Sequence, residues 1–520
     1  MDALHPVVII KLLLAKLNSP AKIILIGLDS ADRNLILKWC ESCDLPNLRA
    51  LQRNGAWGEL ASEPGVGDDA SWASFSTTVS CARHGRFYFR TIEPGSYRTP
   101  RFRDHHLVYE PFWAELSRGG NRVAILDVPK CPLVTDLNGV QVTDWLVHGR
   151  DGGTRSWPAE MAPEICRKYG EDSTDRWGAG SWLCGREQLR DDLYETFIQR
   201  TLHSMQQKLS FAEEVLDRGD WSLFTVVFKE AHCIGHQCWH LLDEGHELFD
   251  ADMAERLGNP VKRVYMALDT AVGRLLDRAG EDTTTIVFSD LGMGRNYTGE
   301  HILDAVLLEL ERSDSSPWAK ARCSVNTAAA RVCSRLVRKG GNYLRKYHRR
   351  FFQIEHNEIS GAIRINLEGR EPRGRVRRGR EMDELCDWLS RELLDITDPD
   401  SGEPVVARVL RTDSTFSGDR LDYLPDLFVI WNRRAPITGA ASPTIGELRL
   451  GAAGFRTGNH VANGIYFAGG HRITPMAQPC GASIMDIGPT VAALLGTTLE
   501  NTDGRPLAAL IAKSMLKCPG

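Results

Sequence analysis

The sequence predicts an α/β protein with a doubly wound, mostly parallel central sheet and helices on both faces. Three observations predict this fold class. Short apolar runs rich in β-branched residues recur along the chain, helical stretches alternate with them, and several of the apolar runs end in a polar residue. The chain has 520 residues, of which 42% are hydrophobic and 25% are charged, with a formal net charge of −5. That composition is typical of a globular protein with a large core.

The expected elements follow one another in the order that such a sheet requires. The first strand is AKIILIGLDSAD, residues 21–32, and LPNLRALQRNG follows as a helix that Gly55 stops. NRVAILDVP, WSLFTVVFKE and TTTIVFSDLG are further strands, and VKRVYMALDTAVGRLLDRAG is a helix between the last two. Near the end, NGIYFAGG and SIMDIGPTVAALLG supply another strand and helix. The core is therefore expected to be discontinuous in sequence.

The predicted domain organisation is an N-terminal helical extension, residues 1–20, and a single catalytic domain, residues 21–520. The extension is apolar for only about a dozen residues and is broken by Lys11 and Lys16, which is too short for a membrane span of about 18 residues. It also lacks the flanks of a secretory signal. Two segments, at about 150–215 and 305–450, are expected to be insertions that cap the site.

The second insertion contains KARCSVNTAAARVCSRLVRKGGNYLRKYHRR and GREPRGRVRRGR. These stretches are interpreted either as a basic surface for a phosphorylated or otherwise anionic substrate or as a solvated helix and loop. The slightly negative net charge gives no reason to expect nucleic acid or an anionic membrane as a main partner. A small, anionic molecule is the expected substrate. No sequence feature fixes an oligomeric state.

Cysteine usage indicates the compartment. The thirteen cysteines form no CxxC pair and are odd in number, and several, such as Cys233, Cys238 and Cys386, lie in apolar segments. This pattern favours reduced, mostly structural thiols and a cytoplasmic location.

Metal-capable side chains follow several of the predicted strands. Asp29 follows IILIGL, His232 and His236 follow LFTVVF, Asp290 follows TTTIVFS, and His460 lies in FRTGNHVANGIYF. In a doubly wound sheet, ligands bind beyond the carboxyl ends of the strands, so these side chains are expected to share one site. Each of them alone has a simpler interpretation, as a polar side chain or a helix cap.

The residue types predict two ions. His232 and His236, at i and i+4, lie on one face of a helix, and His460 would complete a three-nitrogen site suited to zinc or another first-row transition metal. Asp29 and Asp290 would suit a second ion that prefers oxygen. Two divalent ions about 4 Å apart stabilise both the attacking and the leaving oxygen of a displacement reaction. Zinc is the expected metal, with iron or manganese as alternatives.

These residues lie within motifs that occur in the order GLDSAD, SWASFSTTVSCARHG, LDVPKCPLVTDLNGVQVTDWL, FKEAHCIGHQCWHLLD, SDLGMG, GAIRINLEGREPRG, LPDLFVIW, GNHVANGIYFAGG and DIGPTVAALLGTTLENTDGRPL. Over almost the whole chain, the motifs resemble those of the alkaline phosphatase superfamily. They resemble most its branch of type I phosphodiesterases, nucleotide pyrophosphatases and predicted phosphohydrolases and phosphomutases. The resemblance implies a two-metal α/β hydrolase with a Ser or Thr nucleophile. On the same resemblance, Asp29, His236, Asp290 and His460 match metal ligands of the family.

Three positions depart from the family pattern. His232 replaces an aspartate ligand, and Leu291 replaces a histidine ligand. The nucleophile falls on Asp68, or on Gly67 if one residue is skipped, and neither carries a hydroxyl. Asp68 or its neighbour Asp69 would give the second ion an all-carboxylate shell and leave the first ion with an all-imidazole shell. Both aspartates could also simply cap a helix.

The leading hypothesis is the hydrolysis of a phosphodiester, phosphoester or related ester by metal-activated water. Asp68 would act as a ligand, or as a nucleophile that forms an acyl phosphate. Lys229, Arg83 and His84 are candidates to meet substrate charge, although His84 also suits a turn cap. The alternatives are a recruited, non-hydrolytic metalloenzyme of specialised metabolism (a transferase, a lyase or an iron-dependent oxidative enzyme) and a non-catalytic binding protein.

Overall fold

The structure is a computed structural model that describes residues 21–147, 153–171, 189–313, 346–356, 359–452, 456–470 and 472–511. The predicted N-terminal extension, residues 1–20, lies outside the described residues, as does most of the basic stretch 320–350. No helix in the described ranges is both long and apolar enough to cross a membrane.

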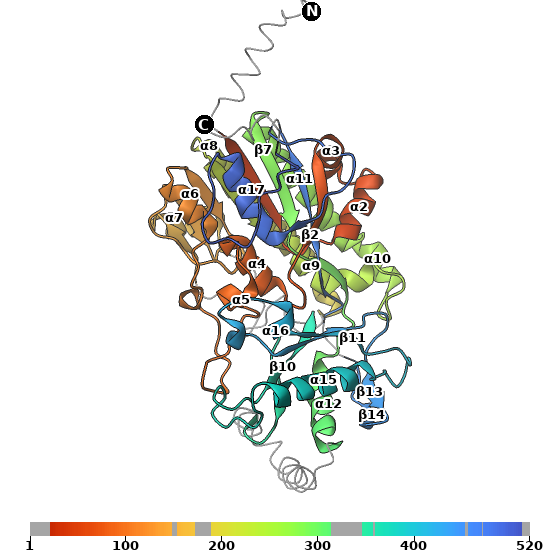
Figure 1. Cartoon of the computed structure of the whole chain (residues 1–520). Helices are drawn as coiled ribbons and strands as arrows, with labels where there is room; N and C mark the ends of the chain where they lie inside the picture. The colour runs from red at the N-terminus through yellow and green to blue at the C-terminus, as the bar shows by residue number, and fades with distance from the viewer. Residues whose placement is uncertain are drawn as a thin grey trace, which may run out of the picture.

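A nine-stranded sheet forms the centre of the molecule (Figure 1). Its strands, in spatial order, are β17 (Ala482–Ser483), β2 (Ala56–Ala61), β16 (Gly464–Gly469), β7 (Thr283–Ser289), β1 (Lys22–Leu28), β6 (Leu223–Phe228), β3 (Val123–Leu126), β4 (Gly139–Thr143) and β5 (Arg155–Trp157). The five strands from β7 to β4 run parallel to one another. β16 and β5 pair antiparallel with their neighbours. The prediction of a mostly parallel sheet is confirmed, with β16 as an antiparallel strand next to β7.

Helices cover both faces of this sheet, as predicted. The helices on one face are α2 (Arg33–Glu41), α3 (Pro46–Asn54), α7 (Met161–Tyr169), α8 (Tyr194–Asp217), α9 (Glu230–Cys238), α10 (Ala251–Leu257) and α11 (Pro260–Ala279). Those on the other face are α4 (Asp68–Thr77), α6 (Phe112–Arg118) and α17 (Ile487–Leu494). The short α5 (Cys81–His84) follows α4. The 3₁₀ turns are Asp104–His106, Asp191–Leu193, Trp239–Leu241, Leu421–Tyr423 and Ile484–Asp486.

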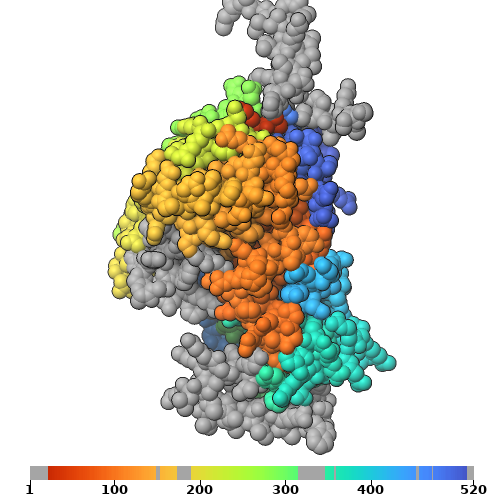
Figure 2. Space-filling view, turned by 90° about the vertical axis from the view of Figure 1, so that its left-hand side faces the viewer, coloured from red at the N-terminus to blue at the C-terminus, as the bar shows by residue number. Residues whose placement is uncertain are grey.

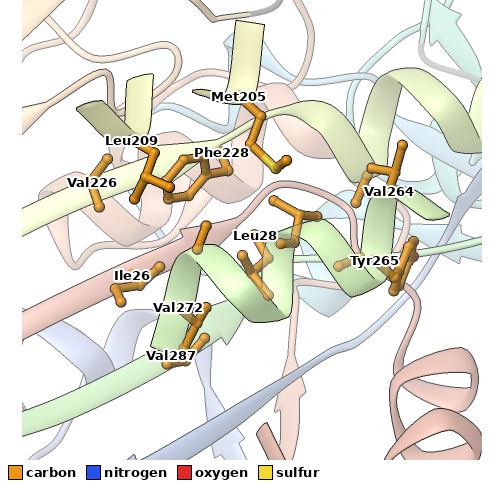
Figure 3. Close-up of a cluster of buried hydrophobic side chains, with 14 of the residues drawn as sticks. Ile26, Leu28, Met205, Leu209, Val226, Phe228, Val264, Tyr265, Val272 and Val287 are labelled. Carbon is orange, nitrogen blue, oxygen red and sulfur yellow. The ribbon is translucent and has the colours of Figure 1, made fainter. Parts of the chain in front are cut away.

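The sequence of β1 explains why the sheet has two apolar faces. Side chains alternate between the two faces of a strand, and the residues of β1 that point to either face are apolar. Ile24, Ile26 and Leu28 belong to the core cluster under α8 and α11, whereas Ile23 and Leu25 belong to the cluster on the opposite face. Figure 3 shows part of the first cluster, in which residues of β1 and β6 meet the helices.

The core packing predicts a large stability effect at Leu209, which is 3% exposed and lies on α8 within the first cluster (Figure 3). Leu209→Ala is expected to lower the free energy of unfolding by about 2–5 kcal/mol, since it removes buried apolar atoms and leaves a cavity. Urea denaturation measures the change. Gln206→Ala, which alters an exposed residue of the same helix, should stay within about 0.5 kcal/mol of the parent protein.

A second, four-stranded antiparallel sheet lies below the large one in Figure 1, with its own apolar core. Its strands, in spatial order, are β11 (Val406–Arg411), β12 (Leu427–Trp431), β10 (Ser360–Ile365) and β9 (Phe351–Ile354). The helices α12 (Glu300–Ser313), α15 (Arg380–Leu394) and α16 (Thr412–Thr415) accompany it. Figure 2 shows the orange part of the chain running down from the large sheet onto the teal part that belongs to this second unit.

Two small antiparallel ribbons complete the fold. One joins β13 (Gly439–Ser442) to β14 (Gly446–Arg449), and the other joins β15 (Gly458–Val461) to β8 (Gly292–Arg295). β8 begins only two residues after Asp290, and in the ribbon His460 lies opposite Met293. This ribbon therefore brings His460 to the end of the sheet where β7 stops.

Candidate metal centre

The predicted strand-end residues come together at one edge of the large sheet. Asp29 follows β1, His232 and His236 lie on α9 just after β6, Asp290 follows β7, and His460 lies on β15. All five are at most 2% exposed. β7, β1 and β6 are adjacent parallel strands, so their carboxyl ends meet at the same place.

The three histidines form a compact cluster. Each pair of imidazole centroids among His232, His236 and His460 is 4.7 Å apart. The Nε2 atoms of His236 and His460 are 3.2 Å apart. Among the described residues, these three form the one group of at least three possible metal-ligating side chains whose ligand atoms all lie within 4.8 Å of one another. Three converging nitrogens are a donor set suited to zinc or another first-row transition metal.

The protein orients His236 from both sides. Its Nδ1 lies 2.8 Å from the carbonyl oxygen of Gly458, which favours a proton on Nδ1 and leaves Nε2 as a lone pair toward the cluster. Arg456 places Nη1 3.2 Å from the same Nε2. Burial lowers the pKa of His236 well below its usual value, and Arg456, His232 and His460 lower it further. His236 therefore stays neutral, which is the form that binds a metal.

The carboxylates lie beside the histidines. Asp29 Oδ2 is 3.2 Å from His232 Nδ1, and Asp29 Oδ1 accepts a hydrogen bond from Trp72 Nε1 at 3.1 Å. Ser30 has a left-handed backbone with φ of 54°, and its N–H donates to Asp290 Oδ1 at 3.0 Å. Such a conformation costs a residue with a side chain about 1–3 kcal/mol, so the fold holds this turn against strain.

The pKa values of Asp290 and Asp29 shift in opposite directions. Burial raises the pKa of Asp290 well above its usual value, and the neighbouring Asp29 and Asp68 raise it further. Burial would also raise the pKa of Asp29, but His232 and His460 reverse the effect and lower it. Asp290 Oδ2 is buried and has no hydrogen-bond partner among the described residues. An uncompensated buried carboxyl oxygen beside two other carboxylates fits a cation-binding position.

Asp68 and Asp69 occupy the first two positions of α4, and both are buried. The Asp69 carboxylate is engaged by cations: Arg86 Nη2 donates to Oδ1 at 2.9 Å, and Lys130 Nζ lies 3.4 Å from the same atom. Asp68, by contrast, is close enough to Asp290 to raise its pKa. Because Arg86 and Lys130 already engage Asp69, Asp68 is the better candidate of the two for a position that faces a metal ion.

The remaining predicted residues do not join the histidine cluster. Leu291 is fully buried next to Asp290 and offers no ligand atom on its side chain. Lys229 is 2% exposed and is the N-cap residue of α9. Arg83 forms an ion pair with Asp503 at 2.6 Å and lies over the Tyr109 ring. It lines a separate open hollow of about 780 Å³.

His84 is a buried structural residue. Its Nδ1 accepts a hydrogen bond from the Arg86 N–H at 3.0 Å, and its Nε2 lies 2.9 Å from Ser74 Oγ. Burial, with smaller effects from Arg86 and Arg420, lowers the pKa of His84 from 6.5 to about 3. The neutral imidazole thus completes the turn after α5.

This shift predicts a pH dependence of stability. The unfolded chain binds a proton at His84 below pH 6.5, whereas the folded chain does so only below about pH 3. His84 therefore does not lower the free energy of unfolding above pH 6.5. As the pH falls from 6.5 toward 3, the free energy of unfolding decreases by about 1.4 kcal/mol per pH unit, because the unfolded chain gains a proton that the folded chain does not bind. Urea denaturation between pH 7 and pH 5 should show a shallower loss for His84→Gln than for the parent. His203→Gln, at an exposed position of α8, is the matched control.

The structure also places residues at the site that sequence reasoning missed. They are Trp72, which orients Asp29, and the cations Arg86, Lys130 and Arg456. The LDVPK stretch contained a usable signal, because Lys130 directly follows the apolar run NRVAILDVP that is predicted as a strand, although β3 itself ends at Leu126. Arg86 and Trp72 contact residues of other elements, so these contacts depend on tertiary packing and cannot be deduced from the spacing of residues in the sequence.

Comparison with known proteins identifies the family of this chain. Among solved structures, an inactive variant of murine ectonucleotide pyrophosphatase/phosphodiesterase 5 in complex with AMP aligns with a TM-score of 0.49 and 12% identity, over 93% of this chain and 97% of that one. The human protein of the same name aligns with a TM-score of 0.45 and 14% identity over the same shares. No curated protein matches. The sequence profile of type I phosphodiesterases and nucleotide pyrophosphatases matches residues 23–460. The chain therefore belongs to the type I phosphodiesterase/nucleotide pyrophosphatase family and is a phosphodiesterase-like enzyme.

Proposed function

We propose that the protein hydrolyses a small phosphodiester or related phosphoester with the help of two divalent metal ions. The observation that carries the proposal is the buried cluster of His232, His236 and His460 next to the carboxylates at the ends of β1 and β7. The histidines would hold the first ion. Asp29, Asp290 and Asp68 would hold the second, which the uncompensated Asp290 Oδ2 supports. Zinc is the proposed metal at the nitrogen site.

The ions would supply Lewis-acid charge for a phosphoryl oxygen and lower the pKa of a water molecule toward about 7. The chain's own residues do the rest. Trp72 holds the Asp29 carboxylate in place by its hydrogen bond, and Gly458 holds the tautomer of His236. On the family resemblance, the position of the hydroxyl nucleophile falls on Asp68, or on Gly67 if one residue is skipped, and neither carries a hydroxyl. Asp68 raises the pKa of Asp290, which supports a role for Asp68 as a ligand, with water as the attacking group.

The chain also surrounds this edge with positive charge. Lys130 and Arg456 are within ion-pair or hydrogen-bond reach of site residues. Cations placed around the charge that develops on a phosphoryl group stabilise the transition state of its transfer. These positive charges support the proposal that the substrate is a small anion.

The experiment compares hydrolysis of bis(p-nitrophenyl) phosphate, p-nitrophenyl phosphate and p-nitrophenyl acetate by metal-stripped protein before and after addition of Zn²⁺, Mn²⁺ or Fe²⁺. The proposal expects phosphoester hydrolysis that returns only with metal. Activity that is the same without metal would contradict metal dependence, and hydrolysis of the acetate alone would contradict the phosphoester assignment.

A second candidate is a non-hydrolytic metalloenzyme, and one observation favours it: the cluster consists of three histidines, with His232 where the family resemblance implies an aspartate, and residue 68 carries no hydroxyl. This set also suits iron. Metal-dependent consumption of O₂ by the Fe²⁺-loaded protein, together with no hydrolysis of either phosphoester, would favour this candidate.

A further inference from the structure

Lys130 lies at the same edge of the sheet as the metal centre. It stands four residues after β3, and β3 is the parallel neighbour of β6, which in turn pairs with β1. Its backbone is left-handed, with φ of 58°, so the chain turns sharply where the side chain departs. The Lys130 side chain is only 8% exposed. A buried ammonium group at a ligand-binding edge requires an anionic partner.

The carboxylate of Asp69, which pairs with Lys130, also pairs with Arg86. Asp69 Oδ1 accepts from Arg86 Nη2 at 2.9 Å, and Lys130 Nζ lies at the longer distance of 3.4 Å from the same oxygen. Among the described residues, this is the one ion pair of the Lys130 ammonium. Arg86 satisfies the Asp69 carboxylate at the better distance. One carboxylate thus serves two cations and cannot neutralise both of them on its own.

The loop that carries Lys130 is fixed. Arg86 Nη1 donates to the Lys130 carbonyl oxygen at 2.9 Å, so a single guanidinium holds both the Asp69 carboxylate and the Lys130 backbone. The Arg86 guanidinium also lies 4.6 Å from the centre of the Phe102 ring. Its Nε is buried without a partner in the described part of the chain. The amine is therefore presented by a rigid support, as a binding group should be.

The ion pair with Asp69 places the amine next to a proposed metal-facing aspartate, because Asp68 and Asp69 are consecutive residues at the start of α4. Burial would lower the pKa of Lys130, but Asp69 and Asp68 raise it above its usual value, and Asp29 adds to the effect. Asp68 and Asp29 belong to the proposed second ion site. The ammonium therefore pairs with the chain neighbour of a residue that is proposed to hold the second ion.

We propose that Lys130, held by Asp69 and Arg86, binds a non-bridging oxygen of the substrate's phosphoryl group. The inference rests on the proposed function, because it assumes that the anion in the site is a phosphoryl group. The inference identifies a cationic side chain, in the loop after β3, that would contact the substrate. A contact between Lys130 and a phosphate oxygen is charge-assisted and stronger than a neutral hydrogen bond.

The experiment measures the binding of inorganic phosphate to the purified, metal-containing protein by isothermal titration calorimetry. Lys130→Gln can still donate a hydrogen bond to Asp69 but carries no charge, so it separates a purely structural role from anion binding. The affinity for phosphate is expected to fall by about 10- to 100-fold, while metal content and melting temperature stay unchanged. Lys22→Gln is the control. Lys22 lies at the start of β1, is exposed and pairs with Asp220.

A measurement on the unaltered protein gives an independent test. Inorganic phosphate should slow the acetylation of Lys130 by acetic anhydride, followed by peptide mass spectrometry, and should leave the acetylation of Lys22 unchanged. Equal rates with and without phosphate, no binding of phosphate by the parent protein, or an affinity of Lys130→Gln within twofold of the parent would each overturn the inference.

The outcomes separate this inference from the proposed function. If the parent protein hydrolyses phosphoesters and Lys130→Gln binds phosphate as tightly as the parent, the inference fails and the function stands. If the parent protein hydrolyses no phosphoester but binds phosphate through Lys130, the function fails and the anion site stands.

Discussion

His460→Ala is expected to abolish the enzyme's activity, because the variant would lose the metal ion that the three histidines are proposed to bind. The imidazole of His460 is 2% exposed, its Nε2 lies 3.2 Å from that of His236, and no other described histidine, cysteine, aspartate or glutamate completes the cluster. Removing one of three nitrogens leaves two, and a structural or catalytic zinc site needs at least three protein ligands. The catalytic efficiency kcat/KM should fall by about 1000-fold or more, since a metal supplies several kcal/mol of transition-state stabilisation.

Two measurements check this expectation. Zinc should raise the melting temperature of the metal-stripped parent protein, because a ligand that binds only the folded state stabilises it, and should not do so for His460→Ala. His356→Ala is the matched control: His356 is also fully buried, but it stacks on Phe87 beside the second sheet. Retention of full activity and of the zinc-dependent shift by His460→Ala would contradict the assignment of His460 as a ligand.

Asp68→Asn is expected to lower kcat by about 100-fold or more, because the substitution keeps the shape of the side chain but removes its charge and its ability to act as an anionic ligand or nucleophile. The protein should still fold and should keep the ion held by the three histidines. Steady-state kinetics and metal analysis together measure both effects.

The control for this substitution is Asp32→Asn. Asp32 is another buried aspartate at the same edge, but its Oδ1 caps α2 through the Leu35 N–H at 2.9 Å, and an asparagine can also cap a helix. Acid-quenching a single turnover with ³²P-labelled substrate separates the two roles of Asp68. Label retained on the protein would identify an acyl phosphate, whereas attack by water leaves the protein unlabelled.

The parallel core and the histidine cluster could be predicted from the sequence because both follow from local pattern. Apolar runs such as the one in β1 define buried strands, and the ends of such strands define the edge where ligands bind. His232 and His236 are one helical turn apart on α9, so their proximity also follows from spacing. His460 needed the additional premise that the GNH stretch reaches the same edge, which the ribbon between β15 and β8 confirms.

The contacts that tune the site could not be predicted in this way. The contacts of Asp69 with Arg86 and Lys130 distinguish it from Asp68, and these cations come from a turn after α5 and from the loop after β3. The antiparallel direction of β16 also depends on tertiary packing, since its apolar sequence suits a strand of either direction. Local pattern therefore locates the site, and packing decides which side chains point into it.

The most direct test of the proposed metal centre is elemental mass spectrometry of the purified protein, run beside His236→Ala and His240→Ala. His240 is a buried histidine that lies four residues from His236 and bonds to Thr457, so it controls for the loss of a buried imidazole from the same region. We predict two equivalents of transition metal per chain in the parent and in His240→Ala, with a loss of metal in His236→Ala. Protein without bound metal that also takes up none on addition of Zn²⁺, Mn²⁺ or Fe²⁺, or a metal content unchanged in His236→Ala, would contradict the metal centre on which the proposed function depends.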